Sequence, residues 1–242
     1  MLDVIRPDWP APAQVRALQT TRYGGVGGGV YDNFNLADHV GDAAEVVAAN
    51  RRALATQVAA PPLWLTQVHG VACVDAAVAA PGAAADAVFA RTPARACAVM
   101  TADCLPLLLC DGAGTVVAAA HAGWRGLAAG VIDATVAAMQ VPGTQLMAWL
   151  GPAIGPAAFE VGDEVRAAFM HDDAGAASAF VAHGRGKWLC DLYALARRRL
   201  ARLGVSRVFG GGFCTYTEGE RFFSYRRDGV TGRMATLIWI AP

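Results

Sequence analysis

Three residues, His69, Cys104 and His121, carry side chains that can bind a metal ion or take part in covalent chemistry. A thiol beside an imidazole either binds a transition metal or forms a nucleophile with its general base. The intervening stretches of 34 and 16 residues match no short zinc-finger spacing. The fold therefore has to bring these residues together, and the elements around them decide whether it can.

A hairpin predicted in the middle of the chain places two of them side by side. Apolar runs over residues 105–110 and 115–120 flank the turn Asp111-Gly-Ala-Gly114, a pattern typical of paired strands. Closing that four-residue loop places Cys104 directly opposite His121. Opposite side chains share a face of the sheet, with Cβ atoms roughly 4.5–5.5 Å apart.

The register of this hairpin is decisive for the pairing. A slip by one residue would move one side chain to the other face of the sheet and separate the pair. Pro106 has no backbone N–H to donate, which predicts that its strand lies at a sheet edge or is bulged there.

Two uses of the pair follow. As a metal site, it needs a third ligand, and His69 at the end of a predicted strand over residues 63–68 is the best candidate. Three protein ligands with an open position are typical of catalytic zinc, and this donor set would also accept copper. As a thiol enzyme, Cys104 would be a nucleophile deprotonated by His121. Spacing alone also leaves an ordinary structural role open for all three residues.

The remaining pattern mixes strands and helices without strict alternation. Helical spacing covers residues 42–58, with Asp42 as the expected N-cap, the stretch that ends near Met139, and residues 162–170 and 192–203. Further strands are predicted over residues 96–100, 208–216, 221–226 and 233–240, the last two forming a hairpin. This mixture predicts an α+β fold, a mixed β-sheet sandwich flanked by helices. Without repeats or a long linker, residues 1–242 are expected to form a single domain.

Composition excludes several classes of function. Hydrophobic residues make up 55% and charged residues 17%, so disorder is not expected. Twenty Lys and Arg balance twenty Asp and Glu, which gives no electrostatic basis for binding nucleic acid or an anionic membrane. No apolar run reaches the ~18–20 residues of a membrane helix, and the N-terminus lacks the pattern of a signal peptide. We expect a cytoplasmic monomer with reduced cysteines.

Motifs along nearly the whole chain resemble the YfiH family. Those around the three candidate ligands are Thr66-Gln-Val-His-Gly70, Thr101-Ala-Asp-Cys-Leu-Pro-Leu107 and Ala120-His-Ala-Gly-Trp-Arg-Gly126. Similar motifs are Thr21-Arg-Tyr-Gly-Gly25, His39-Val-Gly-Asp42, Gly151-Pro-Ala-Ile-Gly-Pro156, Cys214-Thr-Tyr216 and the segment from Phe222 to Arg233. Family members are variously described as multicopper polyphenol oxidoreductases, purine nucleoside phosphorylases and peptidoglycan editing factors. The family's metal ligands fall on His69, Cys104 and His121.

This resemblance implies a zinc-dependent purine nucleoside phosphorylase with adenosine deaminase and methylthioadenosine phosphorylase activity. It also implies a fold with the structural likeness to cysteine-hydrolase-like toxins that has been proposed for the family. Zinc lowers the pKa of bound water towards ~7, so that the water could attack C6 of adenine. Asp103, beside a candidate ligand, is the candidate proton shuttle. It could instead orient that ligand.

Phosphorolysis also needs a cationic phosphate pocket. Arg22, Arg125 and Arg226 are candidates for it because each lies in a family-like motif, and we assign Arg125 a catalytic role. Asn35 and His39 are candidate substrate contacts. The chain departs from the family here, since it has Asn33-Phe-Asn-Leu-Ala37 where the family usually has Ser-Leu-Asn-Leu-Gly.

Three rival functions remain. A copper-dependent polyphenol oxidase needs a larger set of ligands, mostly histidines, and this chain has five His in total. A hydrolase that uses Cys104 and His121 competes with the metal site for the same thiol and could edit peptidoglycan precursors. A non-enzymatic binding protein is the third rival, but such a function would not explain a three-ligand site with an open position.

Overall fold

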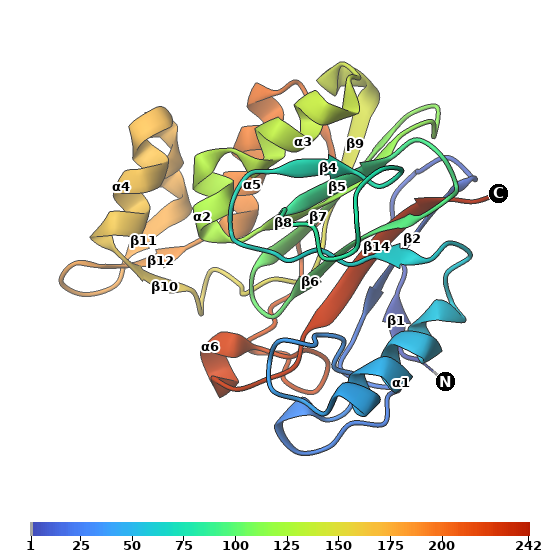
Figure 1. Ribbon diagram of the computed structural model, residues 1–242. Helices are drawn as coiled ribbons and strands as arrows, with labels where there is room; N and C mark the ends of the chain where they lie inside the picture. Colours follow the sequence, from blue (N-terminus) through green and yellow to red (C-terminus); the bar gives the residue numbers. More distant parts are fainter. Residues whose placement is uncertain (1) are drawn as a thin grey trace.

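Two large β-sheets and one small sheet form the frame of the molecule. The computed structural model describes residues 2–242 (Figure 1). A five-stranded sheet has the order β1-β2-β14-β6-β3, a six-stranded sheet has the order β13-β9-β7-β8-β5-β4, and a three-stranded sheet has the order β10-β12-β11. The strands are β1 (Val4–Ile5), β2 (Val15–Thr20), β3 (Pro62–Leu63), β4 (Cys73–Asp75), β5 (Ala87–Ala90), β6 (Ala96–Thr101), β7 (Leu105–Asp111), β8 (Val117–Ala122), β9 (Leu146–Leu150), β10 (Glu160–Gly162), β11 (Phe180–Ala182), β12 (Lys187–Cys190), β13 (Arg207–Gly210) and β14 (Met234–Ile240).

The helices are short and lie outside the large sheets. They are α1 (Ala44–Ala55), α2 (Trp124–Ala129), α3 (Val131–Met139), α4 (Asp163–Asp172), α5 (Leu192–Arg202) and α6 (Tyr225–Asp228), with 3-10 turns at Gly29–Tyr31, Gly143–Gln145 and Ala174–Ala179. Within residues 2–242, none of these helices is long and apolar enough to span a membrane.

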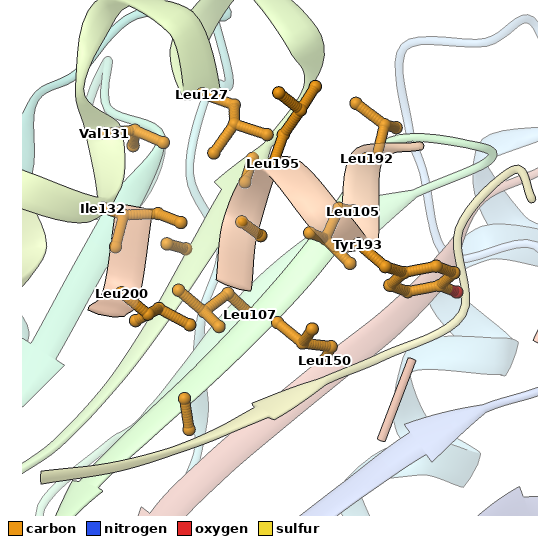
Figure 2. Packing of buried hydrophobic residues seen from close by; sticks show 14 of the residues in the cluster. Leu105, Leu107, Leu127, Val131, Ile132, Leu150, Leu192, Tyr193, Leu195 and Leu200 are labelled. Carbon is orange, nitrogen blue, oxygen red and sulfur yellow. The ribbon is translucent and has the colours of Figure 1, made fainter. Parts of the chain in front are cut away.

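Strand β7 shows how the layers arise from side-chain alternation. Leu105 and Leu107 pack against α2, α3 and α5 (Figure 2), and Leu109 belongs to the same core. The intervening Leu108 and Cys110 face the five-stranded sheet. Both faces of β7 are therefore buried, which explains its nearly continuous apolar sequence.

The five-stranded sheet has the same double-sided burial. Val15, Val99 and Ile238 contribute to the core between the two large sheets, while Leu18, Leu54 and Leu237 belong to a separate core beneath α1. The order of layers is α1, five-stranded sheet, six-stranded sheet, and then α2, α3 and α5 (Figure 1). This confirms the mixed α+β sandwich flanked by helices, whereas the likeness to cysteine-hydrolase-like toxins stays a prediction.

The central hairpin forms with a register two residues away from the predicted one. Pro106 pairs with His121, so Cys104 is diagonal to that histidine and not opposite it. The Asp111 carboxylate causes the shift because its oxygens accept hydrogen bonds from the backbone of Thr115 and Val116, which moves the four-residue loop one position along the chain. A shift of two residues keeps both side chains on the same face.

The strand of Pro106 is predicted to be an edge strand or bulged. The edge alternative is wrong, because β7 lies between β9 and β8, and its pairing with β8 runs through Pro106 without a bulge. The proline is tolerated because the regular pairing with β9 begins only at Leu107. Its carbonyl accepts from Gly151 N at 2.9 Å, and the Gly151 carbonyl accepts instead from the Tyr193 hydroxyl at 3.1 Å. The single proton of this hydroxyl is shared with the Phe213 carbonyl, which lies 2.9 Å away.

Several local predictions also need correction. The strand predicted over residues 221–226 is a loop that leads into α6, so no hairpin forms with β14. The helix predicted to end near Met139 breaks into α2 and α3 at Gly130, which has a φ of +103°. Asp42 does not cap α1, which begins after Ala43, since its carboxylate accepts from Asn35 Nδ2 and Ala43 N.

Candidate metal centre

His69, Cys104 and His121 converge at one end of the space between the two large sheets. His121 is near the end of β8, Cys104 directly precedes β7, and His69 lies in the loop after β3. One potential ligand atom from each residue lies within 4.8 Å of the other two. The His69 Nε2 and Cys104 Sγ atoms are 3.9 Å apart. Within residues 2–242, no other three His, Cys, Asp or Glu side chains are so placed.

A single buried carboxylate, that of Asp86, orients both histidines. Its Oδ1 atom lies 2.8 Å from Nδ1 of His121, which directs the Nε2 atom of that ring towards the cluster. The same carboxylate accepts hydrogen bonds from the backbone N–H groups of Val68, His69 and Gly70 at 3.2, 3.0 and 2.7 Å. These bonds hold His69 with a φ of +59°, in the left-handed region. A carboxylate behind a ligating histidine fixes its tautomer and ring orientation.

Charge around the cluster favours a metal-binding thiolate. Burial by itself would raise the pKa of the Cys104 thiol, but the charge of His121 and hydrogen bonds from both histidines lower this pKa to about 6. Burial would lower the pKa of His121, yet Cys104 and the hydrogen bond to Asp86 raise it to about 9. The pair thus forms a thiolate beside an imidazolium, and a metal ion would replace the shared proton.

The cluster leaves room for an ion because residue 123 is glycine. A Cβ atom added to Gly123 would lie 2.9 Å from Cys104 Sγ, 3.0 Å from His69 Cδ2 and 3.5 Å from His121 Nε2. Two nitrogens and one thiolate sulfur match the ligands that zinc and copper accept. The residues present therefore fit a three-ligand metal site.

A cavity of about 540 Å³ opens directly onto the cluster. This volume lies within the usual range for small-molecule sites. Its polar lining includes Gln67 and Asp103, and its apolar lining includes Met100, Ile154 and Leu192. A ligand in this cavity would contact the open side of the cluster.

Three arginines line the cavity, and each guanidinium lies over an aromatic ring. Arg125 lies 4.4 Å from the Trp124 ring and Arg226 lies 5.3 Å from the Phe159 ring. Arg233 lies 5.7 Å from the Tyr225 ring. No carboxylate within residues 2–242 forms an ion pair with any of the three. Their positive charge is therefore available to an anion in the cavity.

Asp103, the one carboxylate in the cavity lining, is held by the protein on both oxygens. Oδ1 accepts from the Thr215 hydroxyl and Oδ2 accepts from Arg226 N, both at 2.6 Å. These bonds stabilise a φ of +93°, which is strained for a residue with a side chain. Asp103 thereby links the backbone next to Cys104 to the start of α6.

The other three predicted site residues are not brought to the cavity. Arg22 donates to the carbonyls of Asp32 and Gly219 at 3.0 Å each. Asn35 is fully buried and binds backbone groups and the Asp42 carboxylate, and the exposed His39 contacts Asp38 at 3.4 Å. Their contacts hold loops in place, and substrate contacts by these residues stay a prediction.

The sequence interpretation missed Asp86 and Arg233. Asp86 is a lone carboxylate in the apolar stretch 83–90, and an isolated acid there signals a buried partner. Arg233 ends a family-like motif, but the motif contains two other arginines, Arg226 and Arg227, that could equally have been chosen. Cys214, which begins the family-like motif Cys214-Thr-Tyr216, lines a second hollow beside Gly155, where its Sγ accepts from Gly155 N at 3.2 Å.

Known proteins resemble this chain from end to end. Residues 16–241 match the family model described as multi-copper polyphenol oxidoreductase laccase. Purine nucleoside phosphorylase PA4543 of Pseudomonas aeruginosa is 55% identical over 98% of both chains. Purine nucleoside phosphorylase YfiH of Escherichia coli is 54% identical over 99% of this chain and 100% of its own length.

Solved structures show the same architecture. Protein NMB0706 of Neisseria meningitidis superposes with a TM-score of 0.97 at 56% identity and covers 99% of both chains. YlmD of Geobacillus stearothermophilus superposes with a TM-score of 0.92 at 30% identity, over 99% of this chain and 96% of its own.

Proposed function

The chain belongs to the multi-copper polyphenol oxidoreductase laccase family, the YfiH family that its motifs resemble, and from this premise we propose that it is a metal-dependent purine nucleoside phosphorylase. The observation that carries the proposal is the position of the three-residue cluster at the base of a cavity that three unpaired guanidinium groups line. Relatives that are 54–55% identical over nearly their whole length are named purine nucleoside phosphorylases.

Zinc is the metal that we propose for His69, Cys104 and His121. The Cys104 pKa of about 6 provides a thiolate at neutral pH, and Asp86 fixes the His121 tautomer with Nε2 facing the cluster. A zinc ion at this position would supply a Lewis acid. The ion needs no fourth protein ligand, because catalytic zinc sites keep one position open.

The residues of the chain supply binding and orientation for the reaction. Arg125 and Arg226 contribute positive charge that would stabilise the phosphate and the negative charge that develops on the purine as the glycosidic bond breaks. Met100, Ile154 and Leu192 provide apolar surface for the purine. The Asp103 carboxylate accepts a hydrogen bond from the Arg226 backbone N–H and so keeps Arg226 in place. We therefore propose that Asp103 is a positioning residue.

Adenosine deamination and methylthioadenosine phosphorolysis are proposed as further activities of the same site. Methylthioadenosine needs apolar surface beside the ribose 5′ position, and the cavity lining is largely apolar. Deamination needs an activated water in place of phosphate. A single domain over residues 1–242, a monomeric state and a cytoplasmic location stay predictions.

The rival functions have less support from the site. A multicopper oxidase needs several copper centres, whereas one three-residue cluster is present within residues 2–242. The exposed His39, His171 and His183 each contact a nearby acidic residue and do not approach the cluster. A Cys104–His121 hydrolase that edits peptidoglycan precursors remains the second candidate, favoured by the thiolate–imidazolium pair.

Product analysis tests the proposal. The zinc-loaded protein is incubated separately with adenosine, inosine and methylthioadenosine, with and without phosphate, and the products are separated by chromatography. Phosphorolysis predicts free base and a ribose 1-phosphate that form only when phosphate is present. Base release that is independent of phosphate would indicate a hydrolase, and unchanged nucleosides in every reaction would contradict the nucleoside assignment.

A further inference from the structure

Arg233 occupies a fixed position at the junction of the cavity and the five-stranded sheet. It directly precedes β14, whose first residue Met234 pairs with Thr101 of β6. Its backbone N–H donates to Asn35 Oδ1 at 2.9 Å. Its Nη1 atom donates to the carbonyls of Thr231 and Gly232 at 2.9 and 3.0 Å. Bonds at both ends of the residue therefore define where its guanidinium lies.

The guanidinium of Arg233 keeps donors free for a ligand. A guanidinium has five N–H donors, and within residues 2–242 only Nη1 has protein acceptors. The side chain is half-buried, and this burial lowers its pKa below the ordinary value although the nearby charges of Cys104 and Asp103 oppose the shift. Arg125 and Arg226 are more exposed to solvent. A cation shielded from water binds an anion more strongly than an exposed one.

A second unsatisfied donor lies in the same cavity wall. Thr101 is 2% exposed, and its hydroxyl oxygen is buried and has no hydrogen-bond partner among the described residues. Both Thr101 and Arg233 line the cavity. Buried hydroxyl groups in native proteins nearly always have a partner, and rotation of this side chain towards the cavity would let the hydroxyl donate to a bound anion.

We propose that Arg233 anchors the inorganic phosphate of the reaction, with the Thr101 hydroxyl as a second donor to the same anion. The proposal rests on the proposed phosphorolysis. In that step a phosphate oxygen forms the bond to C1′ while the C1′–N9 bond breaks. The electron pair of the broken bond goes to the purine, which takes up the proton that the phosphate loses.

The first test compares Michaelis constants of full-length, zinc-loaded variants. Arg233→Met is expected to raise the KM for phosphate about 10- to 100-fold, as for a lost charge-assisted hydrogen bond, and to change the KM for the nucleoside less than about threefold. Arg233→Lys, which keeps the charge but loses the fork of donors, should give an intermediate rise. Thr101→Val should raise it about three- to tenfold. Arg185→Met, at an exposed arginine outside the cavity, is the matched control.

The second test measures binding without turnover. Isothermal titration of zinc-loaded protein with inorganic phosphate measures the dissociation constant directly. Arg233→Met should raise this constant more than Arg233→Lys does. If phosphorolysis proceeds and both variants keep the wild-type KM for phosphate, the Arg233 assignment fails and the proposed function stands. If phosphate binds through Arg233 but no nucleoside is cleaved, the proposed function fails and the phosphate site stands. Should Arg233→Met fail to fold, Arg233→Lys decides the question.

Discussion

Asp86 lies opposite His121 in the register of β5 and β8, and its Oδ1 atom is 2.8 Å from Nδ1 of that ring. The His121 backbone N–H also donates to the Asp86 carbonyl at 2.7 Å. Two strands of the six-stranded sheet therefore fix one candidate ligand through both its side chain and its backbone. Because the same carboxylate binds the loop of His69, it couples two ligands that are distant in sequence.

Replacing Asp86 by Asn should weaken metal binding about 10- to 100-fold, the usual effect of losing a carboxylate behind a ligating histidine. The amide can no longer serve as an anionic acceptor both for the His121 ring and for the backbone donors around His69. Competition with a chelator of known zinc affinity measures the change. The control is Asp75→Asn, since Asp75 Oδ1 accepts from Ala77 N and does not contact His121. An unchanged affinity in Asp86→Asn would contradict the role of Asp86.

Alkylation of Cys104 in the metal-free protein should show an unusual pH dependence. Its lowered pKa of about 6 means that the reactive thiolate is present above that pH and is lost below it. The reaction with iodoacetamide should reach half its maximal rate near pH 6, whereas an ordinary thiol reaches it near ~8.5. Mass spectrometry of the Cys104 peptide gives the rate. Zinc should suppress the reaction, and a midpoint above pH 8 would contradict the thiolate–imidazolium pair.

The candidate ligands Cys104 and His121 could be predicted from the sequence because they only had to lie on the same face of a sheet, and not in one exact register. A hairpin two residues out of register still places Cys104 and His121 on the same face, so an incorrect pairing led to the correct neighbourhood. The alternation in β7, which gave the layered α+β fold, depends only on which residues are apolar. Local hydrophobic patterns determine such features directly.

Features that depend on contacts between distant residues could not be predicted from local sequence patterns. Arg226 lies in α6, and not in the predicted strand, because distant Asp103 accepts from its backbone N–H. The separation of Arg22 from the cavity results from bonds to Asp32 and Gly219. No local pattern indicates which of several arginines in one motif will face a cavity.

Gly123→Ala should separate metal binding from folding. The glycine has a φ of −60° and a ψ of 156°, which alanine adopts without backbone strain, so stability should fall by no more than the roughly 1–3 kcal/mol that an extra methyl group costs in a packed site. The added Cβ would lie 2.9 Å from Cys104 Sγ and should weaken zinc binding. Thermal unfolding and zinc competition measure the two effects. Gly28→Ala, where no atom lies within 4 Å of the added Cβ, is the control. Zinc binding equal to wild type would show that the cluster needs no space at residue 123.

Arg22→Met and Arg226→Met should have opposite profiles. Arg22 joins two loops and lies 4.9 Å from the Phe223 ring, so its loss should lower stability by about 1–3 kcal/mol. Arg226 lines the cavity, so its loss should mainly raise the KM for phosphate. Chemical denaturation and steady-state kinetics measure the two profiles. A larger rise in that KM for Arg22→Met than for Arg226→Met would restore the direct phosphate contact predicted for Arg22.

Titration of metal-free protein with zinc tests the central claim most directly. Phosphorolysis of inosine is followed as zinc is added, with Cys104→Ala treated in the same way. A catalytic metal held by His69, Cys104 and His121 predicts that activity rises in proportion to zinc up to one equivalent per chain. The variant should stay inactive at the same zinc concentrations. Full activity in the metal-free wild type, or wild-type activity in Cys104→Ala, would contradict the account.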